Sequence, residues 1–173
     1  MELIIDILSD GFFAAIAAIG FGAISNVPVR SFTGCAIPAA IGHMSRFVLM
    51  TILSWNIILA SLIGAFAGGL CAIWLSKYYK CPAESLSIPA MLPMIPGMYA
   101  YHAVQALVLS FSEKSEDGFM HYFMLFNYNA GVCTLVMLAL VAGVLIPIYV
   151  FNKRAFTATR NAECLDPSHP DKI

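Results

Sequence analysis

Two residues within one long apolar segment, His43 and Arg46, have the types and spacing needed for chemistry with charged groups. Because they are three positions apart, a helix places them on one face. Histidine titrates near neutral pH and can bind or carry a proton, and arginine can hold a carboxylate in a bidentate pair. The pair therefore indicates a polar site in apolar surroundings. The alternative is that Arg46 extends its head group to the aqueous edge and His43 only packs.

A third basic residue, Arg30, follows the turn marked by Pro28, since proline cannot continue a helix interior. Arg30 lies roughly 20 Å from His43 along a helix axis. It is a candidate for lining the same path and binding the same solute. An arginine at the end of a span can also serve only to set the orientation of the chain.

The apolar stretch 88–102 cannot form an uninterrupted helix, because it contains Pro89, Pro93, Pro96 and Gly97. Broken backbone is tolerated inside a membrane only where it is buried in protein or lines a wet cavity. Transporters use such breaks to direct helix N-termini at anionic ligands. We therefore include the break in the candidate substrate site, together with the two tyrosines that follow it, Tyr99 and Tyr101. The alternative is an interfacial loop that leads into a span.

Weaker candidates are acids and amides near the ends of apolar runs. Asp10 and His102 join His43 as candidates for carrying a coupling proton, although Asp10 also suits an ordinary interfacial acid and His102 a packing residue. Asn127 and Asn129 suit hydrogen bonds between helices. There is no nucleophile with a base at motif spacing, no HExxH and no phosphate-binding glycine loop, so the sequence predicts neither an enzyme nor a cofactor. The five cysteines are scattered without metal-ligand spacing and predict no metal site.

The elements that must position these residues are membrane spans. Of the 173 residues, 60% are apolar and only 11% are charged, whereas about a quarter of a soluble domain is charged. The mean hydropathy is +0.82. A net charge of −1 without a basic stripe gives no indication of nucleic-acid binding. We expect an all-α polytopic membrane protein.

A hydrocarbon core of about 30 Å needs about 20 apolar residues per helix. We expect a membrane domain over residues 1–156 with about five transmembrane helices, near 7–25, 31–53, 56–76, 88–111 and 119–151, the fourth with a proline-broken approach. Residues 29–55 are the ambiguous segment, because they are long enough to span but contain Arg30, His43 and Arg46. The polar residues 157–173 are expected to be a disordered cytoplasmic tail.

The distribution of charge predicts an orientation, because cytoplasmic loops collect Lys and Arg. Five spans place Arg30, Lys77, Lys80 and the basic tail on the cytoplasmic side. They place the acidic N-terminus and the acidic loop 112–118 outside, with Lys114 as the one basic exception. The same acidity argues against a signal peptide, which carries a basic N-terminal region. We expect the N-terminus outside and the C-terminus inside.

Small residues recur at intervals of four in the span 56–76, as in Ser61/Ala65, Gly64/Gly68 and Ala65/Gly69. Such stripes allow helices to approach closely in lipid, where packing drives association. They indicate contact within this chain or, as the alternative, with a partner subunit.

Three motifs taken together resemble the threonine/serine exporter (ThrE) family. They are Asn26-Val-Pro28-Val-Arg30, then Ala40-Ile-Gly42-His43-Met-Ser-Arg46, then Ile88-Pro89 through Met94-Ile-Pro96-Gly97 with Tyr99. The resemblance covers roughly residues 5–155. It is to the C-terminal membrane domain of the family and, in size, to its small stand-alone subunit of YjjB-like type.

The resemblance implies one half of a split exporter in a bacterial inner membrane, paired with a larger YjjP-like membrane subunit and with self-association as a further possibility. It implies threonine- or serine-like amino acids or dicarboxylates as substrates, and export driven by an ion gradient. An odd number of spans would also let a second five-span unit pair with this one in inverted topology. The competing hypothesis is a structural subunit that stabilises a partner carrying the whole path.

Overall fold

The computed structural model describes residues 2–151, and every regular element in that range is a helix. The helices are α1 (Glu2–Ile24), α2 (Phe32–Thr51), α3 (Ile57–Tyr79), α4 (Ala83–Met91), α5 (Gly97–Ser112) and α6 (Glu116–Val150), with single-turn 3₁₀ segments η1 (Val29–Ser31) and η2 (Leu92–Met94). The prediction of an all-α protein is confirmed. The predicted tail, 157–173, lies outside the described residues.

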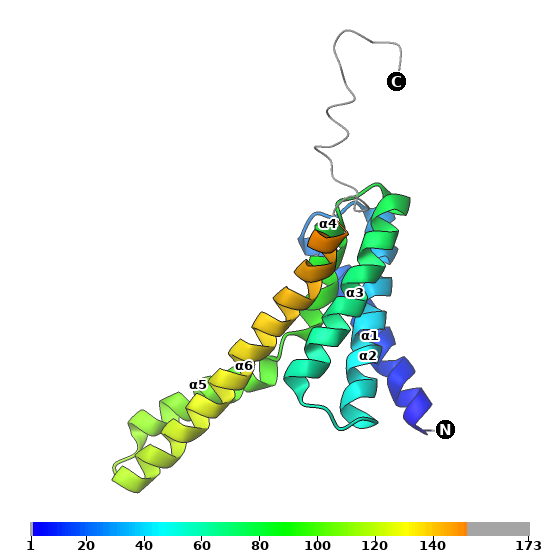
Figure 1. Ribbon diagram of the computed structural model, residues 1–173. Coiled ribbons are helices and arrows are strands. Elements are labelled where there is room, and N and C mark those ends of the chain that lie inside the picture. The colour runs from blue at the N-terminus through cyan, green and yellow to red at the C-terminus, as the bar shows by residue number, and fades with distance from the viewer. Residues whose placement is uncertain (1, 152–173) are drawn as a thin grey trace, which may run out of the picture.

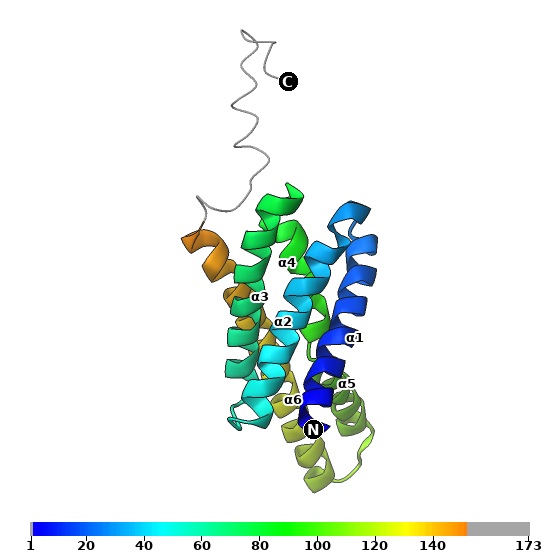
Figure 2. The same cartoon turned by 90° about the vertical axis from the view of Figure 1, so that its right-hand side faces the viewer.

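Helices α1, α2 and α3 lie side by side and run alternately up and down, and the short α4 packs against all three (Figures 1 and 2). Tight turns join them: Asn26 and Ser54 adopt positive φ angles of 56° and 52° in the two connections. The Asn56 side chain caps α3 by accepting from the Ile58 amide at 3.1 Å. We call α1 to α4 the bundle.

Close backbone approach between α2 and α3 depends on glycine. A Cβ added at Gly64 would lie 2.7 Å from the Gly42 carbonyl oxygen, which is too close for any side chain. A Cβ at Gly143 of α6 would likewise lie 2.6 Å from the Leu62 carbonyl oxygen on α3. The small-residue stripe of the third predicted span therefore packs within this chain, which is the first of the two alternatives that the sequence left open.

The predicted break at the start of the fourth expected span is present, and we call α4, this break and α5 together the fourth passage. Helix α4 ends at Met91, η2 contains Pro93, and α5 begins at Gly97 behind Pro96. Pro89 does not break the chain but is buried inside α4. The backbone interruption thus covers residues 92–96 and is shorter than the stretch the sequence indicated, because a proline near the end of a short helix removes only one hydrogen bond.

Beyond the break, α5 turns away from the bundle and returns through α6. The hairpin of α5 and the first part of α6, residues 97–131, projects away from the bundle, and we call it the arm (Figure 1). The second half of α6 returns along α3, so one long helix belongs to both regions. Its 35 residues give a length of about 52 Å, which exceeds a hydrocarbon core of about 30 Å.

Among the described helices, α1, α3 and α6 are long and apolar enough to cross a membrane. With about 1.5 Å of rise per residue, the 23-residue helices α1 and α3 are about 35 Å long. Helix α2, with its polar residues, and the broken passage α4–α5 do not meet that standard by themselves. This is a polytopic helical membrane protein, and five as the number of spans stays a prediction.

Candidate functional site

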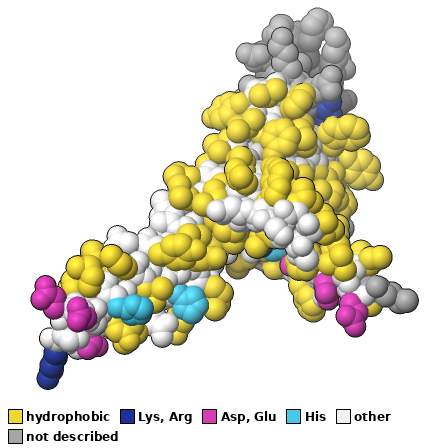
Figure 3. Space-filling model, turned by 60° about the horizontal axis from the view of Figure 1, so that its bottom comes forward, with side chains coloured by type: hydrophobic (Ala, Val, Ile, Leu, Met, Phe, Trp, Pro, Cys, Tyr) yellow, Lys and Arg dark blue, Asp and Glu magenta, His cyan; other side chains and the backbone are white. Residues whose placement is uncertain are grey.

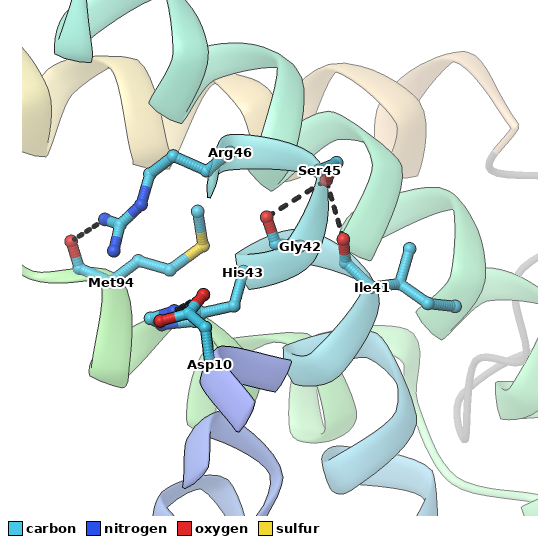
Figure 4. A network of polar contacts seen from close by, with 7 residues as sticks. All are labelled: Asp10, Ile41, Gly42, His43, Ser45, Arg46 and Met94. Carbon is cyan, nitrogen blue, oxygen red and sulfur yellow. Dashed lines mark hydrogen bonds and ion pairs between the residues drawn. The ribbon is translucent and has the colours of Figure 1, made fainter. Parts of the chain in front are cut away.

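A histidine and a carboxylate from two different helices meet inside the bundle. His43 Nδ1 of α2 lies 3.2 Å from Asp10 Oδ2 of α1 (Figure 4). The side chain of His43 is 8% exposed and that of Asp10 is 33% exposed, so the carboxylate is the member open to the surface. When the carboxylate is ionised, the Nδ1–H of His43 donates to it, and this fixes the orientation of the ring.

The other ring nitrogen of His43 has no hydrogen-bond partner among the described residues, although it is sealed from the surface. The buried hydroxyl of Ser61 on α3 also has no hydrogen-bond partner among the described residues. An unsatisfied buried polar group destabilises a fold by about 1–3 kcal/mol, so such groups are retained mainly where they have a use.

Arg46 joins α2 to the break in the fourth passage. Its Nη1 donates to the carbonyl oxygen of Met94 at 2.9 Å (Figure 4). Met94 is the last residue of η2, just before α5, and no backbone N–H of the described residues donates to its carbonyl. The guanidinium carries five N–H donors, and the Met94 carbonyl takes one of them.

The positions of these residues follow from the helices that carry them. Asp10 is about 12 Å from the start of α1, and His43 is about 17 Å from the start of α2, which runs in the opposite direction. Both therefore lie in the middle part of the helix that carries them. Gly64 lets α3 come close to the base of Arg46: a Cβ there would be 3.2 Å from Arg46 Cβ.

We refer to Asp10, His43 and Arg46, together with the Met94 carbonyl, as the polar cluster. It brings an acid, a titratable ring and a permanent cation together inside the helical bundle. Charged groups within membrane helices normally face a partner or a cavity and mark solute or proton paths. The arrangement is chemically able to bind a carboxylate at Arg46 and to exchange a proton at the Asp10–His43 pair.

The structure does not bring all the predicted site residues into this cluster. Arg30 is exposed in η1, at the far end of α2 from Arg46. Pro96 is buried and Gly97 exposed at the start of α5. On α5 itself, Tyr99 is half-buried, while Tyr101 and His102 are exposed and pack edge to face with each other at 5.4 Å between ring centroids. All of these residues except Arg30 belong to the break or the arm.

Two members of the polar cluster were harder to predict from the sequence: Asp10 was given a lower rank, and Met94 was missed. Sequence reasoning favoured an interfacial role for Asp10, and the structure pairs that carboxylate with His43. It did not include Met94, because the interaction uses a backbone carbonyl and no side-chain pattern signals it. Ser61 was visible only as part of a small-residue stripe, which indicates packing and not an unpartnered hydroxyl.

The fold defines a helical membrane protein, and the polar cluster gathers charged groups inside its bundle. Comparison with known families is more specific: the model described as "Threonine/Serine exporter, ThrE" matches residues 10–150. The chain belongs to the threonine/serine exporter family. That family is one of membrane transporters and not of enzymes, and the predicted resemblance is confirmed.

A curated relative from Haemophilus influenzae, described only as an uncharacterized protein, is 31% identical over 152 residues. The match covers 86% of this chain and 48% of the relative, so the chain spans about half the length of the curated relative it matches. No solved structure matches this chain.

Proposed function

We propose that this chain is a membrane subunit of a secondary transporter that exports small amino acids of the threonine/serine type or dicarboxylates, together with a second, larger membrane subunit. The observation that carries the proposal is the polar cluster at mid-depth, joined through Arg46 to the broken passage. Family membership supports the substrate class. The half-length match to the relative supports a second subunit or domain.

In this proposal Arg46 binds the carboxylate of the solute. The Met94 carbonyl holds the guanidinium in place beside the break, and the donors it leaves unused form the fork that a carboxylate fits. The Asp10–His43 pair exchanges a proton as the solute passes, because histidine changes charge near neutral pH. Pro96, Gly97, Tyr99 and Tyr101 line the path beyond the cluster, and His102 is a further proton carrier there.

The proposed membrane orientation places the N-terminus outside and the C-terminus in the cytoplasm of a bacterial cell, in the inner membrane. The start of α1 and the α5–α6 turn lie at the same end of the molecule, and both are acidic (Figures 1 and 3). Arg30, Lys77 and Lys80 lie toward the other end. This asymmetry supports the orientation through the positive-inside rule. Reporter fusions at both termini test this orientation, and finding both termini on one side of the membrane would contradict it.

Export measurements on single variants test the site. We expect His43→Ala and Arg46→Ala each to abolish export of labelled threonine or serine from cells that lack other exporters, while the protein remains in the membrane. Lys77→Ala is the control, because Lys77 is an exposed basic residue at the end of α3, and this variant should export normally. Normal export by both cluster variants would end the site assignment.

The second candidate function is a structural subunit that assembles a partner carrying the whole path. The half-length match to the relative is the observation that favours it. Photo-crosslinking of labelled substrate separates the two functions. Labelling of this chain near Arg46 supports the transport path here, and labelling confined to the partner supports the structural subunit.

A further inference from the structure

The arm differs from every other part of the described chain in having few helix neighbours. Helix α5 packs against α6, while α1 to α4 pack mainly against one another and against the second half of α6. In Figure 1 the hairpin diverges from the bundle along its whole length. Both sides of the hairpin expose apolar residues, among them Val104, Val108, Phe111 and Met124, each at least 59% exposed.

Lipid alone accounts for apolar residues on the arm but not for the polar ones among them. His102, Gln105 and Asn129 line a groove of about 350 Å³ between α5 and α6. His102 and Gln105 are exposed and three positions apart, so they share one face of α5. Gln105 lies about 12 Å from the start of α5 and about 10 Å from its end, well inside the apolar segment. In membranes such side chains usually form hydrogen bonds across to another helix.

The bundle of the same chain does not supply that other helix, because the arm leads away from it (Figure 1). A second copy is also a poor occupant for electrostatic reasons. The arm ends in Glu113, Glu116 and Asp117, and the exposed start of α1 carries Glu2 and Asp6 at the same end of the molecule (Figure 3). A copy inserted in the same orientation would present its own acidic groups at the same level as this acidic end, and like charges repel.

The length of the relative indicates what kind of occupant to expect. The Haemophilus influenzae relative has about as many residues outside the match as inside it. Those residues form a further region of that relative, outside its match to this chain. The arm, with exposed hydrogen-bonding groups inside its span and an acidic tip, fits a helical membrane region that brings polar side chains at mid-depth and basic or neutral groups at the outer end.

We propose that the face of the arm carrying His102, Gln105 and Leu109 is the docking surface for a different membrane-embedded helical partner, the counterpart of the region of the relative that this chain does not match. The inference rests on the two-subunit part of the proposed function and adds the surface and the chemistry of the contact. Hydrogen bonds from the partner reach His102 and Gln105, and the partner's helix fills the groove between α5 and α6.

Site-specific photo-crosslinking in intact membranes tests this surface. A photoreactive p-benzoylphenylalanine replaces Gln105 or Leu109 in one set of variants. In the control it replaces Trp74, which is 80% exposed on α3 of the bundle. The probe is the tagged membrane protein, from the same genome, that matches the remaining region of the relative, co-expressed with this chain. We expect an adduct of the two chains from positions 105 and 109, at least tenfold stronger than from position 74.

Three outcomes would overturn the proposal: equal labelling from position 74, an adduct of twice this chain's mass as the main product at the arm, or labelling of lipid only at the arm. An export assay of the same cells distinguishes failure of the surface from failure of the function. If this chain exports threonine without the second protein, the two-subunit function itself is wrong. If export needs both chains but the adduct forms at position 74, only the docking surface is wrong.

Discussion

The bundle and the arm contain similar polar residues within apolar helices, yet they use them differently. In the bundle, Asp10 and His43 reach each other from two helices, and Arg46 reaches the Met94 carbonyl. In the arm, His102 and Gln105 are exposed beside a groove. A polar residue within an apolar helix therefore finds partners inside the protein when neighbouring helices converge on it. It stays on the outer surface when the helix that carries it has few neighbours.

The two regions also differ in how much space surrounds their helices. Helices of the bundle approach through glycines, as at Gly64 against the Gly42 carbonyl. In the arm, α5 buries the small residues Ala103, Ala106 and Ser110, and the rings of Phe111 and Phe119 meet across the hairpin with 6.5 Å between centroids. Dense contact on all sides makes the bundle intolerant of added volume, whereas the arm has open space around it.

The largest difference should appear when volume is added to each region. Gly64→Val places atoms against the Gly42 carbonyl oxygen, so we expect a loss of about 3 kcal/mol or more and little folded protein in the membrane. Gly131→Val in α6 is the matched control, because a Cβ there meets nothing within 4 Å. Membrane abundance and thermal unfolding in detergent measure both. Equal stability of the two variants would contradict the close approach of α2 and α3.

The next largest effect concerns charge at the proposed carboxylate site. Arg46→Gln removes the guanidinium, and we expect export to fall roughly 30-fold or more, as for loss of a buried charge pair of about 2 kcal/mol. Lys77→Gln, an exposed basic residue of α3, should leave export within about twofold. Initial export rates at matched protein levels give the answer. Unchanged export by Arg46→Gln would remove that residue from the path.

A smaller effect is expected at the carboxylate of the cluster. Asp10→Asn keeps the shape but removes the charge that faces His43, and we expect about a tenfold loss of export, since a charge-assisted hydrogen bond contributes about 1.5 kcal/mol. Asp6→Asn is one turn earlier on α1 and exposed, so it should export normally. If the two variants behave alike, Asp10 is the interfacial acid that the sequence favoured.

The smallest effect on the isolated chain should come from the polar residues of the arm. The double variant His102→Leu/Gln105→Leu removes exposed groups without opening a cavity, so we expect its unfolding free energy to stay within about 0.5 kcal/mol of the parent. The same variant should lose most of the adduct formed from position 109 with the second protein. A marked loss of stability in the isolated chain would instead place these residues in contacts within the chain.

Much of the architecture was predictable because lipid imposes strong rules on sequence. Long apolar runs predicted α1, α3 and α6, and prolines predicted the interruption before α5. His43 and Arg46 were found because polar residues are rare in such runs. Their partners could not be found in this way. Asp10 lies 33 residues from His43, and Met94 lies 48 residues from Arg46, so each contact depends on how separate helices cross.

The sequence by itself determined that the chain is a helical membrane protein, where its fourth passage breaks, and that its motifs resemble those of the threonine/serine exporters. Composition and local spacing are enough for these three conclusions, because each depends on single helices and on the lipid around them. Only the tertiary structure decided that Asp10 joins His43 and that the arm stands apart with His102 and Gln105 exposed. Those facts depend on the angles at which helices meet, and glycine contacts, turns and a long shared helix set those angles together.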